Sequence, residues 1–230
     1  MQNLLIALRA SVAISEKCTS GPRVPGKAGG FAISSLVIIE CPMQASAKRP
    51  AIFLDRDGTL NLEVDYLRRP EDVILIPGAA EAIARLNTGN ISVIIISNQS
   101  GVGRGLFGWE DYLAVMKKID ELLSDAGARI DDAYACPFFE NGLGDYRHSD
   151  HPDRKPNPGM ILSAAQKHCI DLERSWMIGD KESDLEAGRN AGCHTALVLT
   201  GYGKNVNPAL ADIVADDLGQ AIEKILAAGL

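Results

Sequence analysis

Two polar segments of this 230-residue sequence each carry two aspartates close together. In the segment Asp55-Arg56-Asp57-Gly58-Thr59-Leu60, two aspartates stand two residues apart directly after an apolar run. Two ionised carboxylates at that spacing would repel each other in a dry cleft, and a divalent metal is the usual remedy. The segment Gly179-Asp180-Lys181-Glu182-Ser183-Asp184 supplies Asp180 and, one helical turn later, Asp184. Because carboxylate oxygens are hard ligands, this set favours Mg²⁺ over zinc, with Asp184 as a possible additional ligand.

A carboxylate held beside such a cation can attack phosphorus to give an aspartyl-phosphate, which divides one difficult displacement into two easier ones. The second aspartate of the pair can then protonate the leaving alkoxide and later take a proton from water. Two other segments offer partners for phosphoryl oxygens: Ser97 with the backbone amides after it, and Lys155 in Arg154-Lys155-Pro156. Taken singly, Ser97 fits an ordinary turn and Asp180 a helix N-cap. Their joint occurrence favours catalysis.

These segments follow elements that would bring them to one place. Apolar runs predict strands at 51–54, 91–97, 133–136, 175–178 and 195–199. Helical patterns cover 79–86, 109–126, 159–168, 183–191 and 218–227. This alternation predicts an α/β fold, a three-layer doubly wound parallel sheet with helices on both faces. Since ligands bind at the carboxyl ends of the strands in such sheets, we expect the polar segments to form one site there.

The four segments together resemble the four motifs of the haloacid dehalogenase (HAD) superfamily of phosphohydrolases, over about residues 50 to 203. Longer strings are similar to the D-glycero-D-manno-heptose-1,7-bisphosphate phosphatases, whose relatives include the histidinol-phosphate phosphatases. These strings are Phe53-Leu54-Asp55-Arg56-Asp57-Gly58-Thr59-Leu60-Asn61, Ser97-Asn98-Gln99-Ser100-Gly101-Val102-Gly103-Arg104-Gly105 and Arg154-Lys155-Pro156-Asn157-Pro158-Gly159-Met160. The resemblance implies a Rossmann-like sheet of the HAD type and a small phosphorylated metabolite as substrate.

Carried over residue by residue, the resemblance implies that Asp55 is the nucleophile and Asp57 the general acid and base. It implies that Mg²⁺ is bound by Asp55, Asp180 and the backbone carbonyl of Asp57, while Ser97 and Lys155 steady the phosphoryl group. The residues that would face the substrate are Glu63, Val64, Asp65, Tyr66, Asn98, Gln99, Ser100, Arg154 and Lys181.

The sequence departs from this family in one loop. The family often holds a structural zinc through Cys-x-His and a second pair of cysteines just before Arg-Lys-Pro. Here Phe138 stands at the histidine position, and His151 and Asp153 stand near the Arg-Lys-Pro string. A site made of Cys136, His148, His151 and Asp153 would have donor types that zinc accepts. Because three of the four family ligands are replaced, we expect the structural Zn²⁺ to be lost, and the altered loop leaves the exact substrate open.

Composition excludes several other classes of function. The net charge of −7 argues against a nucleic-acid partner, since a duplex binder needs clustered Lys and Arg. No apolar run approaches the ~18 residues of a membrane span. Five scattered cysteines without a CxxC pair fit a reducing compartment, so we expect a cytoplasmic protein. The stretches 58–76 and 136–158 are too short for a large cap domain, and the cleft should be open.

The first 42 residues contain four basic and two acidic residues, against an acidic remainder. We predict that 1–42 is a leader, either a disordered tail or the product of an upstream start with the real start at Met43, and that 43–230 is the HAD-like phosphatase domain. An export signal would want basic residues ahead of its apolar run, and residues 1–3 carry no charged side chain. Truncation to Met43 is expected to change neither stability nor rate.

The resemblance therefore implies a Mg²⁺-dependent phosphomonoester hydrolase that removes the 7-phosphate of a heptose 1,7-bisphosphate or a related sugar phosphate, as a monomer or small homo-oligomer. One alternative is a histidinol-phosphate phosphatase, against which the string from Ser100 to Gly105 argues. An alternative of another class is a catalytically silent metal-dependent binding protein. The completeness of the nucleophile, acid, phosphoryl-binding and metal positions argues against it.

Overall fold

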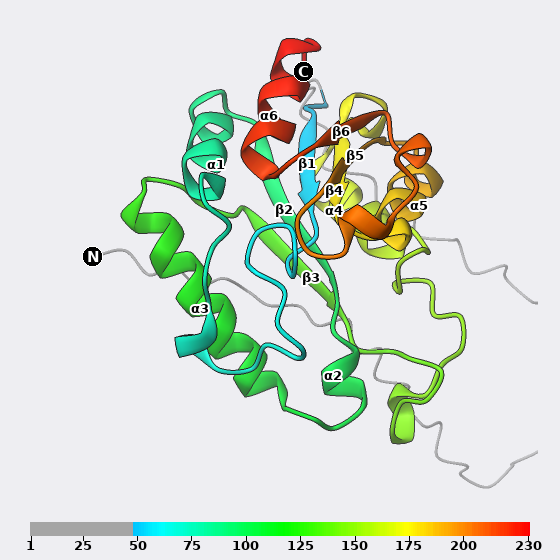
Figure 1. Cartoon of the computed structure of the whole chain (residues 1–230). Helices are drawn as coiled ribbons and strands as arrows, with labels where there is room; N and C mark the ends of the chain where they lie inside the picture. Colours follow the sequence, from blue (N-terminus) through cyan, green and yellow to red (C-terminus); the bar gives the residue numbers. More distant parts are fainter. Residues whose placement is uncertain (1–47) are drawn as a thin grey trace, which may run out of the picture.

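A six-stranded parallel sheet lies at the centre of the computed structural model, which describes residues 48–230 (Figure 1). The strands are β1 (Ala51–Leu54), β2 (Ser92–Asn98), β3 (Asp132–Cys136), β4 (Trp176–Gly179), β5 (His194–Val198) and β6 (Ile213–Ala215). They are arranged in the order β3-β2-β1-β4-β5-β6, and every neighbouring pair is parallel. The order reverses between β1 and β4, which is where doubly wound sheets bind their ligands.

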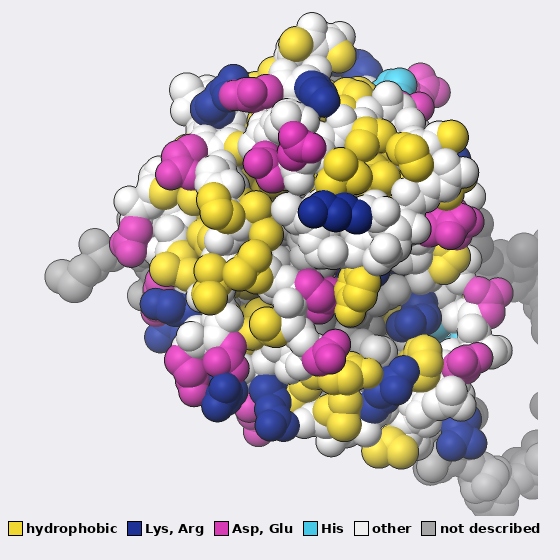
Figure 2. Space-filling view, viewed as in Figure 1, with side chains coloured by type: hydrophobic (Ala, Val, Ile, Leu, Met, Phe, Trp, Pro, Cys, Tyr) yellow, Lys and Arg dark blue, Asp and Glu magenta, His cyan; other side chains and the backbone are white. Residues whose placement is uncertain are grey.

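Helices cover both faces of this sheet. They are α1 (Ala79–Thr88), α2 (Ser100–Gly103), α3 (Trp109–Asp125), α4 (Gly159–His168), α5 (Glu182–Ala191) and α6 (Leu218–Ala227). Figure 1 shows α1, α3 and α6 on one side of the sheet and α4 and α5 on the other. Buried side chains of the first three helices belong to one apolar core, and those of α4 and α5 belong to a second. Acidic, basic and apolar side chains are interspersed on the surface shown in Figure 2.

The central strands are apolar throughout because both of their faces are buried. All four residues of β1 are buried, with Ile52 and Leu54 in the first core and Ala51 and Phe53 in the second. Successive side chains of a strand point to opposite faces, so a strand covered on both sides needs an unbroken apolar run. This is why the apolar runs of the sequence predict the sheet.

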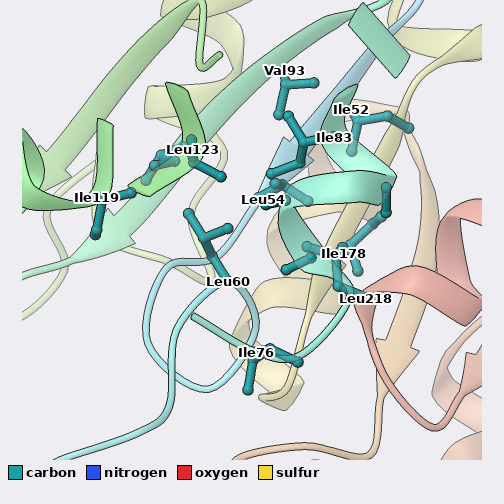
Figure 3. Close-up of a cluster of buried hydrophobic side chains, with 14 of the residues drawn as sticks. Ile52, Leu54, Leu60, Ile76, Ile83, Val93, Ile119, Leu123, Ile178 and Leu218 are labelled. Atoms are coloured by element: carbon teal, nitrogen blue, oxygen red, sulfur yellow. The ribbon is translucent and has the colours of Figure 1, made fainter. Parts of the chain in front are cut away.

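The segment after β1 is anchored in the first core. Leu60 is fully buried and packs in the same cluster as Ile83 and Ile119, and Ile76 joins them from the end of the segment (Figure 3). Burying one such side chain stabilises the fold by about 1.5–3 kcal/mol. The turn from Asp55 to Leu60 is therefore held at both ends, by β1 and by Leu60.

The α/β fold with a doubly wound parallel sheet is confirmed, and most element bounds differ from the predicted ones by one or two residues. The sequence analysis missed α2 and β6. β6 has only three residues and lies between Asp212 and Asp216, so it is too short to produce a recognisable pattern. Within the described part of the chain, the stretches 58–76 and 137–158 contain no helix or strand beyond short 3₁₀ turns at Pro70–Asp72 and Gly144–Tyr146, so no large cap domain is present there.

Two other expectations concern the chain as a whole. The predicted leader, 1–42, lies outside the described residues, and the division into 1–42 and 43–230 stays a prediction. In the range 48–230, every helix is too short or too polar to cross a bilayer.

A cluster of charged side chains links the end of α4 to the start of β3. It lies away from the carboxyl ends of β1 and β4. The buried Asp132 carboxylate, at the start of β3, accepts hydrogen bonds from Lys167 (2.6 Å) and contacts His168 Nε2 (2.7 Å) at the end of α4. Burial alone would raise the pKa of Asp132, but the hydrogen bonds from Lys167 and His168 outweigh it and lower the pKa below its ordinary value. The ionised form is thus favoured in the folded protein.

We expect Asp132→Asn to lower the free energy of unfolding by about 1–2 kcal/mol at pH 7, because a charge-assisted hydrogen bond is lost. A carboxyl whose pKa is lowered by folding stabilises above its ordinary pKa of about 4, and this contribution disappears as the pH falls through the lowered value. Urea unfolding at neutral and acidic pH should therefore show a gap between the two proteins that closes in acid. A gap that stays constant with pH would contradict the ion-pair account, and the exposed Asp125→Asn is the matched control.

Candidate active site

Three buried carboxylates meet at the carboxyl ends of β1 and β4. Oxygen atoms of Asp55, Asp180 and Asp184 all lie within 4.8 Å of one another, the only such group of three or more metal-binding side chains among residues 48–230. The buried Lys155 ammonium lies 2.7 Å from Asp55 Oδ1 and 2.7 Å from Asp184 Oδ1, and it also donates to the carbonyl of Ile96. The predicted juxtaposition of strand ends is thus present, with one cation between two of the carboxylates.

Asp180 is the carboxylate that this cation does not reach. Burial, and then the charge of Asp55, raises the pKa of Asp180 to about 7. Its Oδ2 accepts a hydrogen bond from the backbone amide of Tyr202 at 2.8 Å, whereas its buried Oδ1 accepts none. An unsatisfied carboxylate oxygen among three clustered carboxylates fits a hard divalent cation such as Mg²⁺.

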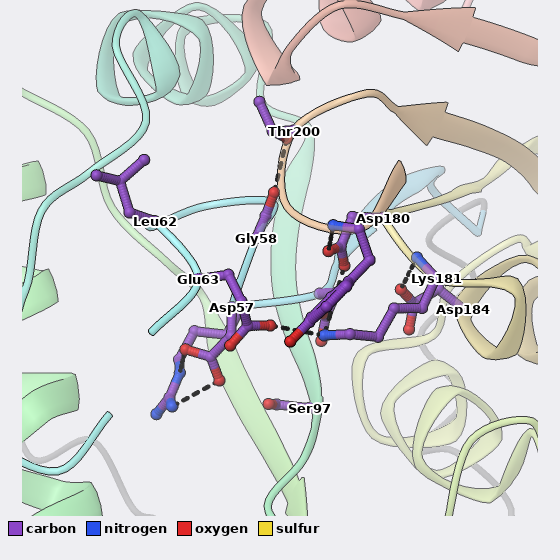
Figure 4. Close-up of polar contacts among 12 residues, drawn as sticks. Asp57, Gly58, Leu62, Glu63, Ser97, Asp180, Lys181, Asp184 and Thr200 are labelled. Carbon is purple, nitrogen blue, oxygen red and sulfur yellow. Dashed lines mark hydrogen bonds and ion pairs between the residues drawn. The ribbon is translucent and has the colours of Figure 1, made fainter. Parts of the chain in front are cut away.

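A separate hydrogen-bond network holds Asp57. The Arg56 guanidinium donates to both oxygens of Asp57, which is labelled in Figure 4, at 3.0 and 2.7 Å. Asn61 and Gln99 donate to Asp57 at 3.1 and 3.2 Å. Arg56 itself is fully buried, with its Cζ 5.3 Å from the centre of the Tyr112 ring. Burial would raise the pKa of Asp57, but the charge and hydrogen bonds of Arg56 outweigh it and lower that pKa. Arg56 therefore favours the ionised form of Asp57.

Two glycines allow the backbone to approach Asp180 closely. Gly58 (φ +88°) and Gly201 (φ +53°) occupy the left-handed region, and a Cβ on either would lie within 2.3 Å of Asp180 Oδ2. The Thr200 hydroxyl donates to the Gly58 carbonyl at 2.6 Å, which joins the loop after β5 to the loop after β1. The carboxylate thus lies between two loops that both need glycine.

The three residues that begin with Ser97 organise the end of β2. Gln99 donates to the Ser97 hydroxyl at 2.8 Å as well as to Asp57. The Asn98 side chain binds the backbone of Lys155 twice, donating to its carbonyl and accepting from its amide, both at 3.0 Å. Asn98 therefore fixes the loop that carries Lys155.

A cleft of about 290 Å³ opens beside these groups. Lys181 donates to Glu63 there at 2.9 Å, and its ammonium lies 5.0 Å from the centre of the Tyr202 ring. Burial raises the pKa of Glu63, despite the nearby positive charge of Lys181. The predicted residues that line the cleft are Asp57, Glu63, Val64, Asp65, Tyr66, Asn98, Gln99, Ser100 and Lys181.

Other predicted residues lie elsewhere. Arg154 does not line the cleft; its Nη1 donates to the carbonyl of Phe138 at 3.0 Å. The candidate zinc ligands, Cys136, His148, His151 and Asp153, do not form a group of three ligand atoms within 4.8 Å in the described part of the chain. The zinc site is therefore not supported: Nδ1 of His148 and Nδ1 of His151 accept backbone amides at 3.2 and 3.1 Å, and Phe138, whose ring is stacked on His151, offers no ligand atom.

Sequence reasoning missed several residues that shape the site. Arg56 stands between the two aspartates, and a charged residue inside a buried strand end is a signal that could have identified it. Thr200, Gly201 and Tyr202 also surround Asp180, and they follow β5 as the other segments follow β1 and β4. These three residues could have been predicted by considering the residues after every predicted strand as candidates for the site.

The comparisons with known proteins agree with this geometry. Residues 153–221 match a family model described as HAD-hydrolase-like. A D-glycero-D-manno-heptose-1,7-bisphosphate 7-phosphatase of Thermosynechococcus vestitus is 43% identical over 188 residues, covering 77% of this chain and 95% of that protein. The corresponding β-anomer phosphatase of Mesorhizobium japonicum is 43% identical over 152 residues, which cover 66% of this chain and 70% of that one.

A solved structure extends the similarity to the fold. The D,D-heptose 1,7-bisphosphate phosphatase of B. bronchiseptica, complexed with magnesium and phosphate, has a TM-score of 0.70 and 34% identity, covering 78% of this chain and 99% of that one. Fold and relatives define a phosphatase with the HAD-like hydrolase fold. Within that class, the chain belongs to the family of the D-glycero-D-manno-heptose-1,7-bisphosphate 7-phosphatases.

We expect Gly58→Ala to abolish most activity, because the added Cβ would lie 2.3 Å from Asp180 Oδ2 and displace this carboxylate. The left-handed φ adds about 1–3 kcal/mol of strain. Gly127→Ala is the matched control, since Gly127 has φ +72° but a Cβ added there would meet no atom within 4 Å. Thermal melting should show both variants destabilised, while only Gly58→Ala loses phosphate release. Equal activities in the two variants would contradict the role given to this contact.

Proposed function

We propose that this protein is a Mg²⁺-dependent hydrolase that removes the 7-phosphate of D-glycero-D-manno-heptose 1,7-bisphosphate through a phosphorylated Asp55. The observation that carries the proposal is the buried Asp55 carboxylate, bound by Lys155 at 2.7 Å and clustered with Asp180 and Asp184 at the reversal point of the sheet. The names of the relatives supply the substrate.

The residues that would hold Mg²⁺ are Asp55, Asp180 and the backbone carbonyl of Asp57, with Asp184 beside them. The unsatisfied Oδ1 of Asp180 and the raised pKa of Asp180, about 7, both fit a missing positive charge. When bound, Mg²⁺ offsets the charge of the carboxylates and of the phosphoryl oxygens, so that an anionic nucleophile can approach an anionic ester.

In the first step, an Asp55 oxygen forms a bond to phosphorus while the bond from phosphorus to the sugar oxygen breaks. Asp57 donates a proton to that oxygen, so the sugar leaves as an alcohol. Arg56 lowers the pKa of Asp57, whereas a negative phosphoryl group beside Asp57 would raise it, because a like charge disfavours the carboxylate. Binding of the phosphate ester thus favours the protonated form of Asp57, which can act as the acid.

In the second step, water attacks the phosphorus of the aspartyl-phosphate and Asp57 takes the proton of that water. The Asp55 carboxylate and inorganic phosphate are the products. Ser97, at 1% exposure, and the ammonium of Lys155 would donate to the phosphoryl oxygens in both steps. These donors are fixed in advance, because Gln99 binds Ser97 and Asn98 binds the Lys155 backbone.

The cleft accounts for a small phosphorylated metabolite as substrate. Its 290 Å³ is near the lower end of the volumes of small-molecule sites, and no large cap closes it among the described residues. We assign substrate contacts to the residues of 63–66, to Asn98, Gln99 and Ser100, and to Lys181 and Arg154. A cytoplasmic location and a monomer or small homo-oligomer remain predictions.

Neither alternative is favoured. Relatives at 34–45% identity are heptose bisphosphate phosphatases, which speaks against histidinol phosphate as substrate. A silent binding protein would not need to retain Asp55, Lys155 and the carboxylate cluster together. Measuring turnover would distinguish the hydrolase from a silent binding protein.

We expect Asp55→Asn to reduce phosphate release on the order of 10⁴-fold or more, because the amide cannot attack phosphorus. The assay is release of inorganic phosphate from heptose 1,7-bisphosphate with Mg²⁺. The exposed Asp216→Asn serves as the control and should turn over normally. An active Asp55→Asn would exclude the covalent mechanism.

We expect Asp57→Asn to slow hydrolysis of the heptose ester by roughly 10²-fold or more, through loss of proton donation. An aryl phosphate such as 4-nitrophenyl phosphate has a leaving group that needs little protonation. The rate at which this ester phosphorylates Asp55 should therefore fall much less in Asp57→Asn. Single-turnover release of nitrophenolate measures this step alone. An equal loss on both esters would mean that Asp57 does not act as a general acid.

A further inference from the structure

The Lys181 ammonium lies where the loops that follow β1, β4 and β5 meet. Glu63, in the loop after β1, binds it at 2.9 Å, and both residues are labelled in Figure 4. The ring of Tyr202, in the loop after β5, has its centre 5.0 Å from the same nitrogen. Glu63, Lys181 and Tyr202 all line the cleft. Residues of two other loops therefore determine where this ammonium lies.

Asp180 is a further partner close to this ammonium. Lys181 Nζ lies 3.7 Å from Asp180 Oδ1, which is beyond hydrogen-bond distance. The same oxygen is buried, accepts no hydrogen bond and belongs to the set assigned above to Mg²⁺. Burial would lower the pKa of Lys181, but the charges of nearby carboxylates, Asp55 first, outweigh it and raise that pKa. Lys181 is therefore a cation attracted toward an oxygen that the metal needs.

The backbone of Lys181 does not keep the two groups apart. Its amide donates to Asp184 Oδ2 at 3.0 Å at the start of α5, so the backbone stays beside the carboxylates. The separation depends on the flexible side chain, which is turned toward Glu63. The side chains of Lys181 and Glu63 are 37% and 21% exposed, so solvent screens their ion pair less than one on the open surface. Glu63 can therefore compete with Asp180 for the ammonium.

Tyr202 contacts both partners in this competition. Its backbone amide donates to Asp180 Oδ2 at 2.8 Å, which satisfies that oxygen and leaves Oδ1 open. Its ring attracts the ammonium, because the face of an aromatic ring carries partial negative charge. Thr200, two residues earlier, donates to the Gly58 carbonyl and joins this loop to the one after β1. Tyr202 thus holds an uncharged partner for Lys181 next to the carboxylate.

We propose that Glu63 and Tyr202 are positioning residues that hold the Lys181 ammonium away from Asp180 Oδ1 and so leave this oxygen free for Mg²⁺. The inference rests on the proposed function, because it takes Asp180 as a ligand of Mg²⁺. Both residues act through Lys181, in the protein without substrate. For Glu63 and Lys181 this role is additional to the substrate contacts assigned above, whereas Tyr202 has no other assigned role.

A simpler explanation would give Glu63 a similar effect. Glu63 is a carboxylate that lines the cleft, and its negative charge alone would attract a cation to the site. The two explanations differ in whether the effect of Glu63 depends on Lys181. A double-mutant cycle on these two residues measures that dependence.

The test measures the dissociation constant of Mg²⁺ for the whole purified chain without substrate, by isothermal titration calorimetry. The variants are Glu63→Gln, Lys181→Met and the two combined. Asp65→Asn is the matched control, because Asp65 belongs to the same loop and lines the cleft but forms no ion pair with another residue of 48–230. Asp180→Asn shows whether the measured binding uses the carboxylate cluster, and the melting temperature of each variant shows that it is folded.

We expect Glu63→Gln to raise the dissociation constant about tenfold, because the released ammonium pairs with Asp180 Oδ1; this corresponds to about 1.4 kcal/mol. Lys181→Met should bind Mg²⁺ at least as tightly as the wild type. Adding Glu63→Gln to Lys181→Met should change the dissociation constant by less than about twofold, and Asp65→Asn should do no more in the wild type.

Tyr202 provides an independent variant pair. Tyr202→Leu removes the ring and should weaken Mg²⁺ binding about threefold, while Tyr202→Phe keeps the ring and should bind as the wild type does. Both variants retain the backbone amide that binds Asp180, so a loss confined to Tyr202→Leu belongs to the ring. Equal affinities in the two variants would exclude Tyr202 as a positioning residue.

A tenfold loss from Glu63→Gln that persists beside Lys181→Met, or that Asp65→Asn reproduces, would overturn the proposal, since Glu63 would then act by its charge alone. Unchanged affinity in Glu63→Gln, with binding that Asp180→Asn abolishes, would overturn the proposal and leave the proposed hydrolase intact. Wild-type protein that binds no Mg²⁺, or that binds it as Asp180→Asn does, would refute the metal ligands of the proposed function together with this inference.

Discussion

Charge balance at the ends of β1 and β4 is the constraint on which the site depends. Two ionised carboxylates about 4 Å apart repel by roughly 4 kcal/mol at an effective dielectric constant of 20, and here three lie within 4.8 Å. Lys155 bridges Asp55 and Asp184, whereas Asp180 has a pKa raised to about 7. Lys181 lies 3.7 Å from Asp180 but is shared with Glu63 at 2.9 Å. When all four carboxylates are ionised, the two ammonium groups leave two negative charges, which a divalent cation would balance.

The surrounding structure serves to hold this cluster in place. Lys155 is fixed through its ammonium by the Ile96 carbonyl and through its backbone by Asn98, and both partners come from β2. The loop after β1 is fixed by Leu60 in the apolar core, which keeps Asp57 beside Arg56. Asp55 and Asp57 follow β1, Asp180 and Asp184 follow β4, and Lys155 is bound by residues of β2. The parallel sheet therefore brings the charged groups together, and its strand order determines where the cleft opens.

Sequence reasoning succeeded where a pattern has a direct physical cause. The buried strands read as apolar runs, α4 and α6 were predicted with their observed bounds, and the carboxylates meet because parallel strands end at one edge. It failed where the cause lies in tertiary contacts. The burial of Arg56 depends on packing against Tyr112, which is far away in the sequence. The contact of the Phe138 ring with His151 also forms only in the folded chain. β6 was missed for another reason, since three residues are too few to form a recognisable pattern.

The central claim is that phosphorus is bonded to Asp55 during turnover. Its most direct test is rapid acid quenching of the protein mixed with Mg²⁺ and excess heptose 1,7-bisphosphate, followed by mass spectrometry of the digested chain. The account predicts one added phosphoryl group, on the peptide that contains Asp55, within the time of a single turnover. Steady release of phosphate with that peptide unmodified throughout, or with the group on another residue, would contradict it.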